Sequence, residues 1–164
     1  MVFLDIQLDV EGNFIQEIVA EGEMFRWYFT IKCNSCNEQF ENEIYFTELE
    51  EVEMQGSRGV AHFGATCKNC KRWGYITLHN SSAKKLRLEG GHGKGTFATF
   101  DCRGIEIVKW EPHNQLVGIA EESETKFQEM DLSDLPWCDY DEKTQNNVEI
   151  EKFEQEIVRN KNLK

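Results

Sequence analysis

The chain has 164 residues, 40% of them hydrophobic and 12% aromatic, so it can bury a core as one domain or two small subdomains. Eighteen basic and 30 acidic residues give a formal charge of -12, which repels phosphate backbones and anionic lipid and argues against nucleic acid as a partner. The sequence has no signal-peptide pattern and no apolar run of about 18 residues, so we expect an intracellular, cytoplasmic protein that does not span a membrane.

The first half of the chain is dominated by strand patterns. Apolar and polar residues alternate over residues 4–10, and Phe25, Trp27, Phe29 and Ile31 occupy every second position of a segment that leads directly into Cys33. Shorter strand-like runs are predicted at residues 44–46, 52–54, 60–66 and 75–79.

A glycine-rich segment, residues 90–95, divides the chain near its middle. Its spacing matches no phosphate-binding motif and no helical pattern follows it, so we interpret it as a hairpin or linker. We therefore expect a zinc-binding unit of residues 1–80 and a second β unit of residues 81–164. Residues 81–96 match no pattern that we can place.

Beyond the glycine segment the strand patterns continue. Strands are predicted at residues 97–101, 105–110 and 116–120, and a turn at 135–142. A strand begins at 148, and residues up to 157 can continue it only across a bulge or as a helix; we choose the strand. Because strand-like runs outnumber helical ones, the sequence predicts a mainly β fold.

Two CxxC pairs, Cys33 with Cys36 and Cys67 with Cys70, carry the strongest chemical signal. Two residues between cysteines let one tight turn direct both sulfurs to a single point, and two such turns supply the four thiolates of a tetrahedral Zn²⁺ site. Four protein ligands leave no position for a reacting water, so we predict one structural zinc ion per chain.

The second pair is flanked by Lys68, Lys71 and Arg72, a basic cluster in an acidic chain. Four thiolates around one divalent cation carry a formal charge of about -2, which nearby cations and amide donors would offset. The alternative is a small docking patch for an acidic partner.

Other reactive side chains are interpreted structurally. Cys102 beside Arg103 is a possible nucleophile, but its alternation with Phe100 favours a buried strand thiol. Asp139, Asp141 and Glu142 lack the spacing of an EF-hand loop and are read as a surface turn. The four histidines show no metal-ligand spacing and receive no role.

Together these segments resemble the eukaryotic CXXC-motif-containing zinc-binding proteins over almost the entire chain. The motifs are residues 25–28 leading into Cys33-x-x-Cys36, Arg58-Gly59 before Cys67-x-x-Cys70, residues 100–104, and Trp137 before residues 139–143. The resemblance implies an all-β molecule of two β-barrel-like halves with pseudo-twofold symmetry and a tetrathiolate zinc in the N-terminal half. It also implies Cys33, Cys36, Cys67 and Cys70 as the ligands.

Function is less closely defined by the resemblance, because the family it points to has no established activity. A link to copper-chaperone binding has been proposed for that family. Two classes therefore stay open: a non-catalytic module that binds a protein partner, or a thiol redox enzyme that uses Cys102 or a CxxC pair. A redox CxxC pair needs a helix N-terminus to lower a thiol pKa, whereas both pairs here follow strands.

Overall fold

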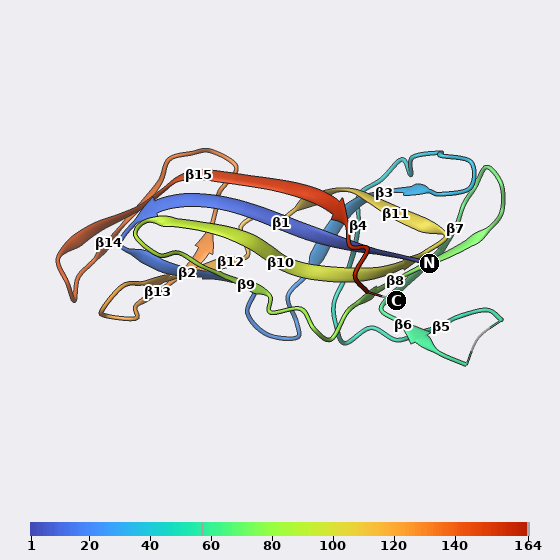
Figure 1. The fold of residues 1–164 in the computed structure, drawn as a ribbon, viewed down its shortest axis with the longest axis horizontal. Helices are drawn as coiled ribbons and strands as arrows, with labels where there is room; N and C mark the ends of the chain where they lie inside the picture. Colours follow the sequence, from blue (N-terminus) through green and yellow to red (C-terminus); the bar gives the residue numbers. More distant parts are fainter. Residues whose placement is uncertain (57, 164) are drawn as a thin grey trace.

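The computed structural model describes residues 1–56 and 58–163, and its regular structure is entirely β. Fifteen strands and no helix occur in these residues, which confirms the predicted fold class. The same residues accordingly contain no helix that is long and apolar enough to cross a membrane. The molecule is elongated, and three long strands follow its long axis (Figure 1).

One six-stranded antiparallel sheet extends along the whole molecule, in the order β14-β15-β1-β10-β8-β7. Its strands are β1 (Val2–Asn13), β7 (Phe63–Thr66), β8 (Trp73–Leu78), β10 (His92–Arg103), β14 (Trp137–Asp141) and β15 (Asn146–Arg159). The pairing of β1 with β15 shifts register between Glu11 and Gly12. This irregularity carries β15 past Ile150, as the sequence predicts.

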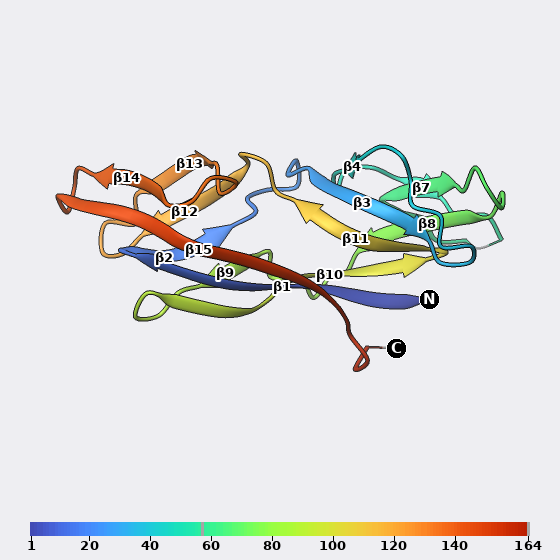
Figure 2. The same cartoon turned by 90° about the horizontal axis from the view of Figure 1, so that it is seen from above.

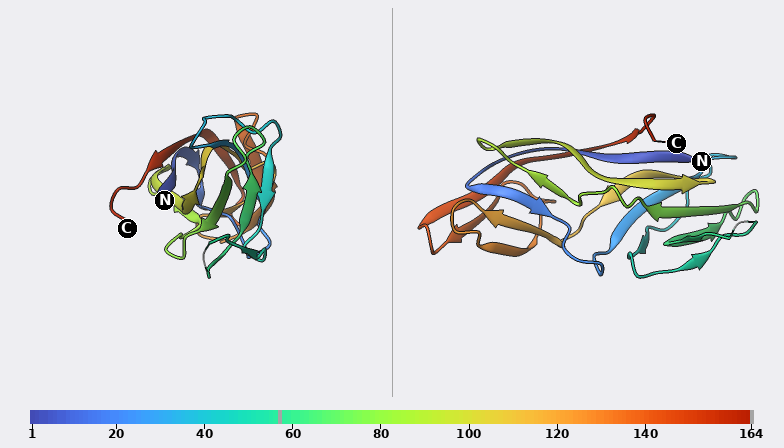
Figure 3. Two further views of the ribbon diagram at one scale, coloured as in Figure 1. Left: turned by 90° about the vertical axis from the view of Figure 1, so that its right-hand side faces the viewer. Right: turned by 60° about the horizontal axis from the view of Figure 1, so that its bottom comes forward.

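Smaller sheets cover the two ends of the long sheet (Figure 2). One end holds β3 (Trp27–Cys33), β4 (Ile44–Phe46) and β11 (Ile105–Glu111), together with the pair β5 (Val52–Glu53) and β6 (Val60–Ala61). The other end holds β2 (Ile15–Val19), β9 (Lys85–Arg87), β12 (Leu116–Ala120) and β13 (Lys126–Met130). Seen along the long axis, the sheets curl around a common interior (Figure 3, left).

The core is continuous from one end to the other. The aromatic strand β3 buries every second residue, so Trp27, Phe29 and Ile31 face inward as predicted, and Phe25, just before the strand, is buried as well. Trp27 is fully buried, and its ring centroid lies 5.8 Å from that of Trp110 on β11. Period-two burial of large aromatic side chains therefore fixes the register of this end of the molecule.

Two sequence-based expectations were wrong in part. The glycine segment does contain a tight turn, at residues 89–92, but it is no linker, because β10 begins at His92 and includes Gly93. A Cβ at Gly93 would lie only 2.5 Å from the carbonyl oxygen of Arg87, so glycine permits a close approach to the preceding chain there. Residues 135–142 were expected as a turn, yet Trp137–Asp141 forms β14 and pairs with β15.

The molecule is not divided at residue 80 into two consecutive units. That boundary falls between β8 and β9, and strands from both sides of it pair in several sheets. β1 pairs with β10 and β15, β3 pairs with β11, and β2 pairs with β12. Each end is therefore assembled from separate segments of the chain, joined by the long central strands (Figure 1).

Candidate metal centre

The four cysteines of the CxxC pairs lie together at one end of the molecule. All four sulfur atoms are within 4.8 Å of one another, and the Sγ–Sγ distances are 3.6 Å for Cys33–Cys70 and 3.6 Å for Cys36–Cys67. A regular tetrahedron with Zn–S bonds of about 2.3 Å has edges of about 3.8 Å. The four thiols are thus close enough to coordinate one metal ion.

The two CxxC turns share one backbone design. Cys33 ends β3, its carbonyl accepts a hydrogen bond from the N–H of Asn37 (2.9 Å), and its own N–H donates to the carbonyl of Glu38 (2.9 Å). The second turn repeats the first bond, from the N–H of Lys71 to the carbonyl of Cys67 (2.9 Å). Asn37 and Lys71 both adopt a left-handed conformation, with φ of 62° and 66°. In each turn the chain therefore reverses direction just beyond the second cysteine, and this reversal directs both sulfurs inward.

Amide donors surround the sulfurs. The N–H of Cys36 is the main group that lowers the pKa of Cys33, and the side chain of Asn69 is the main group that lowers the pKa of Cys36, to about 6. At Cys70 the N–H of Arg72 favours the thiolate, but burial and the neighbouring thiols outweigh it and raise the pKa to about 11. Four thiolates this close together would repel one another, and a divalent metal among them would offset that charge.

The first CxxC turn is held by a residue far away in the sequence. The N–H of Asn34 donates to the carbonyl of Gly104 (3.2 Å), in the turn between β10 and β11. Gly104 has φ of 74°, and a Cβ there would lie 2.5 Å from the carbonyl oxygen of Trp73. Gly104 ends a motif of the sequence, residues 100–104, whose local pattern does not indicate this contact. The positive φ and the close approach to Trp73 explain why glycine occupies the position.

The basic side chains of the second turn bind groups other than sulfur. Lys71 Nζ donates to the carbonyl of Lys68 (2.7 Å), and Arg72 Nη1 donates to Ser35 Oγ on the first turn (3.2 Å). All three cations are exposed. Arg72 therefore links the two turns, while backbone and Asn69 donors supply the hydrogen bonds to the thiols.

Cys102 is a buried strand thiol, as predicted. Its side chain is fully buried on β10, and Sγ contacts the carbonyl oxygen of Phe100 at 3.9 Å. Burial, reinforced by the charge of Asp101, raises the pKa of Cys102 far above its ordinary value. The sixth cysteine, Cys138, is exposed on β14 and lies outside the four-thiol cluster.

The prediction of a surface turn was wrong for Asp141. Asp139 and Glu142 are exposed, but Asp141 is only 1% exposed. Its carboxylate accepts hydrogen bonds from the hydroxyls of Ser123 and Thr125 on another loop. Asp141 is therefore a buried structural acceptor rather than a solvated acid.

The four histidines lie in four separate places, and each forms a hydrogen bond with a different partner. These pairs are His62 with the N–H of Leu78, His79 with Ser81, His92 with Asp9, and His113 with Glu43.

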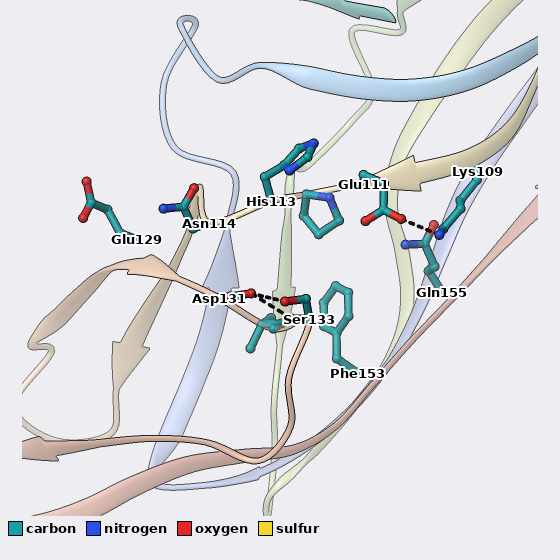
Figure 4. Close-up of a pocket in the computed structure, with 11 residues that line it drawn as sticks. Lys109, Glu111, His113, Asn114, Glu129, Asp131, Ser133, Phe153 and Gln155 are labelled. Carbon is teal, nitrogen blue, oxygen red and sulfur yellow. Dashed lines mark hydrogen bonds and ion pairs between the residues drawn. The ribbon is translucent and has the colours of Figure 1, made fainter. Parts of the chain in front are cut away.

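A pocket of about 570 Å³ lies away from the thiols, bordered by β11, β15 and the loop after β13 (Figure 4). Lys109 and Glu111 pair across its rim, and Asp131 accepts hydrogen bonds from Ser133 (Figure 4). Lys109 and Glu111 therefore neutralise one another, and Asp131 is held by Ser133.

Comparison with known proteins identifies the family. The sequence profile of the eukaryotic CXXC motif containing zinc binding protein matches residues 4–158. A UPF0587 protein of Nematostella vectensis is 36% identical over 92% of this chain and 94% of its own length. The CXXC motif containing zinc binding protein of Rattus norvegicus is 36% identical over 94% of this chain and 96% of its own. The crystal structure of C1orf123 superimposes with a TM-score of 0.86 at 31% identity, covering 96% of this chain and 99% of that one. This chain belongs to the eukaryotic CXXC motif containing zinc binding protein family.

Proposed function

We propose that this protein is a non-catalytic protein-interaction module in which Cys33, Cys36, Cys67 and Cys70 hold one structural zinc ion. The observation that carries the proposal is the four-thiol cluster, with every sulfur within 4.8 Å of the others. Four thiolates fill a tetrahedral shell, so zinc has no open position at which to activate water. The ion would tie the end of β3 to the β7–β8 hairpin and so stabilise a binding scaffold.

The alternative is a thiol redox enzyme, which needs a kind of cysteine environment that these cysteines do not have. A reactive thiol is accessible and has a lowered pKa. Cys102 is fully buried with a raised pKa. The CxxC pairs follow strands and form turns, and a bound zinc ion would occupy their thiolates.

A protein partner is proposed because the four-thiol site suits a scaffold better than a reaction centre. A copper chaperone is a predicted partner on the family resemblance alone. Neither nucleic acid nor a membrane suits a chain with a formal charge of -12.

Thiol labelling of the zinc-loaded protein tests the proposal. A brief pulse of iodoacetamide at neutral pH, followed by peptide mass analysis, should label the exposed Cys138 first. The four clustered cysteines should react only after a chelator is added, and Cys102 only after unfolding. Cys138→Ser is the control, and it should remove the early label completely. Rapid labelling of Cys102, or of a CxxC pair while zinc is bound, would support the redox enzyme instead.

A further inference from the structure

The charge of the chain is distributed very unevenly. Residues 54–88 contain seven of the 18 lysines and arginines and none of the 30 acidic residues. Their formal charge is +7, and the remainder of the chain carries -19. This segment includes the second CxxC turn and the strands on either side of it.

Three of the seven cations gather on that turn without a carboxylate partner. Eight lysines and arginines form ion pairs in the part of the chain that the structure describes, for example Lys84 with Glu48 at 2.7 Å. Lys68, Lys71 and Arg72 are exposed, and among the described residues no carboxylate lies within 4.0 Å of their charged nitrogens. The charged groups of Lys71 and Arg72 donate to the carbonyl of Lys68 and the hydroxyl of Ser35, so pairing with the thiolates does not account for these two cations.

An exposed aromatic residue adjoins these cations. Trp73 is 48% exposed, whereas Trp27 and Trp110 are fully buried. Its ring stacks on that of Tyr75, with centroids 6.4 Å apart and planes at 7°. Arg103 pairs in register with Tyr75, and these three residues line a hollow of about 240 Å³. Exposed aromatic and arginine side chains are typical of binding surfaces.

We propose that the surface formed by Lys68, Lys71, Arg72, Trp73 and Arg103, here named the knuckle surface, binds an acidic segment of a partner protein. Carboxylates of the segment would pair with the three cations that have no carboxylate partner, and an apolar side chain would enter the hollow beside Trp73. This inference rests on the proposed interaction function and names the surface and the chemistry of the partner.

A short acidic peptide suits the knuckle surface better than a nucleic acid does. Screening at physiological salt reduces electrostatic interactions beyond about 8 Å, so a peptide that contacts only this surface escapes most of the repulsion from the acidic remainder. A nucleic acid carries a charge on every nucleotide and extends past the surface towards regions of like charge. The partner should therefore present a few carboxylates around one apolar residue.

A binding experiment with defined probes tests this inference. The probe is a fluorescein-labelled peptide of alternating glutamate and glycine around a central leucine. A peptide with glutamine in place of glutamate and an oligothymidylate of equal length are the comparison probes. Fluorescence anisotropy should show saturable binding of the glutamate peptide alone, weaker at higher salt. Binding of oligothymidylate but not of the glutamate peptide would overturn the inference in favour of a nucleic acid.

Matched variants locate the binding. The triple variant Lys68→Ser/Lys71→Ser/Arg72→Ser should weaken binding of the glutamate peptide roughly tenfold. Each exposed ion pair contributes little individually, so the effect is expected from removing all three. Lys85→Ser/Lys94→Ser/Lys143→Ser removes three other exposed cations that lack carboxylate partners in the described structure, and it should bind like the wild type. Equal losses in both variants would mean non-specific attraction and would overturn the proposal.

Two further readouts separate folding and function from binding. Zinc content should be unchanged in the first triple variant, because none of the three side chains belongs to the four-thiol cluster, so that its loss of binding reflects charge. Unlabelled peptide should shift the emission of Trp73 in the wild type, and this shift should be absent in Trp73→Phe. If the thiols behave as described above but the peptide does not bind, the knuckle surface is refuted while the structural-zinc proposal stands.

Discussion

At the scale of single residues, Asp141 joins two loops through one buried carboxylate. Hydroxyls of Ser123 and Thr125 reach it from the loop between β12 and β13, and the hydroxyl of Thr144 and the N–H of Lys143 reach it from the turn after β14. The bond from Ser123 contributes most to lowering the pKa of Asp141. Sequence alone could not separate Asp141 from the exposed Asp139, because two of its donors lie more than a dozen residues away.

Asp141→Asn should lower the unfolding midpoint by about 5 °C at neutral pH, because the amide presents N–H groups to donors that need an acceptor. The folded-state pKa of Asp141 is below its ordinary value of 3.8, so the carboxylate stabilises the fold above that value and loses its effect as pH falls through the lower folded-state pKa. The difference between wild type and variant should therefore shrink in acid. Thermal unfolding followed by circular dichroism measures it. Asp139→Asn, an exposed match, should change little, and an equal effect of the two substitutions would contradict the role of Asp141.

At the scale of elements, the turn between β10 and β11 supports the metal centre. Gly104→Ala should cost about 2–4 kcal/mol, since alanine is strained at φ of 74° and its Cβ would meet the carbonyl of Trp73. Relief of that contact should displace the Gly104 carbonyl, weaken its bond from the N–H of Asn34, and so speed zinc release to a chromogenic chelator. Gly22→Ala is the matched control, because Gly22 has φ of 82° but an added Cβ meets nothing within 4 Å. Urea unfolding should show a smaller loss in the free energy of unfolding for Gly22→Ala than for Gly104→Ala. If both variants release zinc at the wild-type rate, the turn between β10 and β11 does not support the metal centre.

The elements differ in how well the sequence predicts them. Segments with one buried face, such as β3 and residues 6–12 of β1, follow the period-two pattern closely. β14 was mistaken for a turn because it exposes Cys138, Asp139 and Tyr140 in succession at the edge of the sheet, which removes the alternation. The metal-ligand candidates were predictable because CxxC spacing is local, whereas Gly104 supports them through a contact across 70 residues of chain.

At the scale of the whole molecule, sheet order was beyond the reach of sequence patterns. β1 pairs Val2 with Cys102 on one side and Leu4 with Arg159 on the other, and no local signal specifies such distant partners. The glycine segment looked like a boundary between two units because glycine commonly marks loops. Here Gly93 permits close packing inside a strand that links both ends, and the molecule shares one core.

Because both ends share one core, zinc removal tests whether the two ends of the molecule unfold together or separately. β7 is an edge strand of four residues that, within the described part of the chain, pairs only with β8, so the metal centre is well placed to stabilise it. β12 and β13 belong to the sheet at the opposite end and connect to the zinc end through the long strands and the shared core. Structural zinc contributes on the order of 10–16 kcal/mol in small zinc peptides, where little else holds the fold. Here we expect partial rather than complete loss of structure.

Hydrogen exchange with mass analysis, with and without a chelator, tests this expectation. Amides of β7 and the two CxxC turns should exchange on the order of 100-fold faster after zinc removal, because local opening becomes easier where the metal held the chain. Amides of β12 and β13 should keep most of their protection, since their pairing and buried side chains do not involve the metal. Cys36→Ser should reproduce the chelator effect, and Cys138→Ser, which changes an exposed cysteine, should not. Uniform acceleration at both ends would show that the molecule folds as one zinc-dependent unit, and unchanged exchange in β7 would show that the metal is not structural.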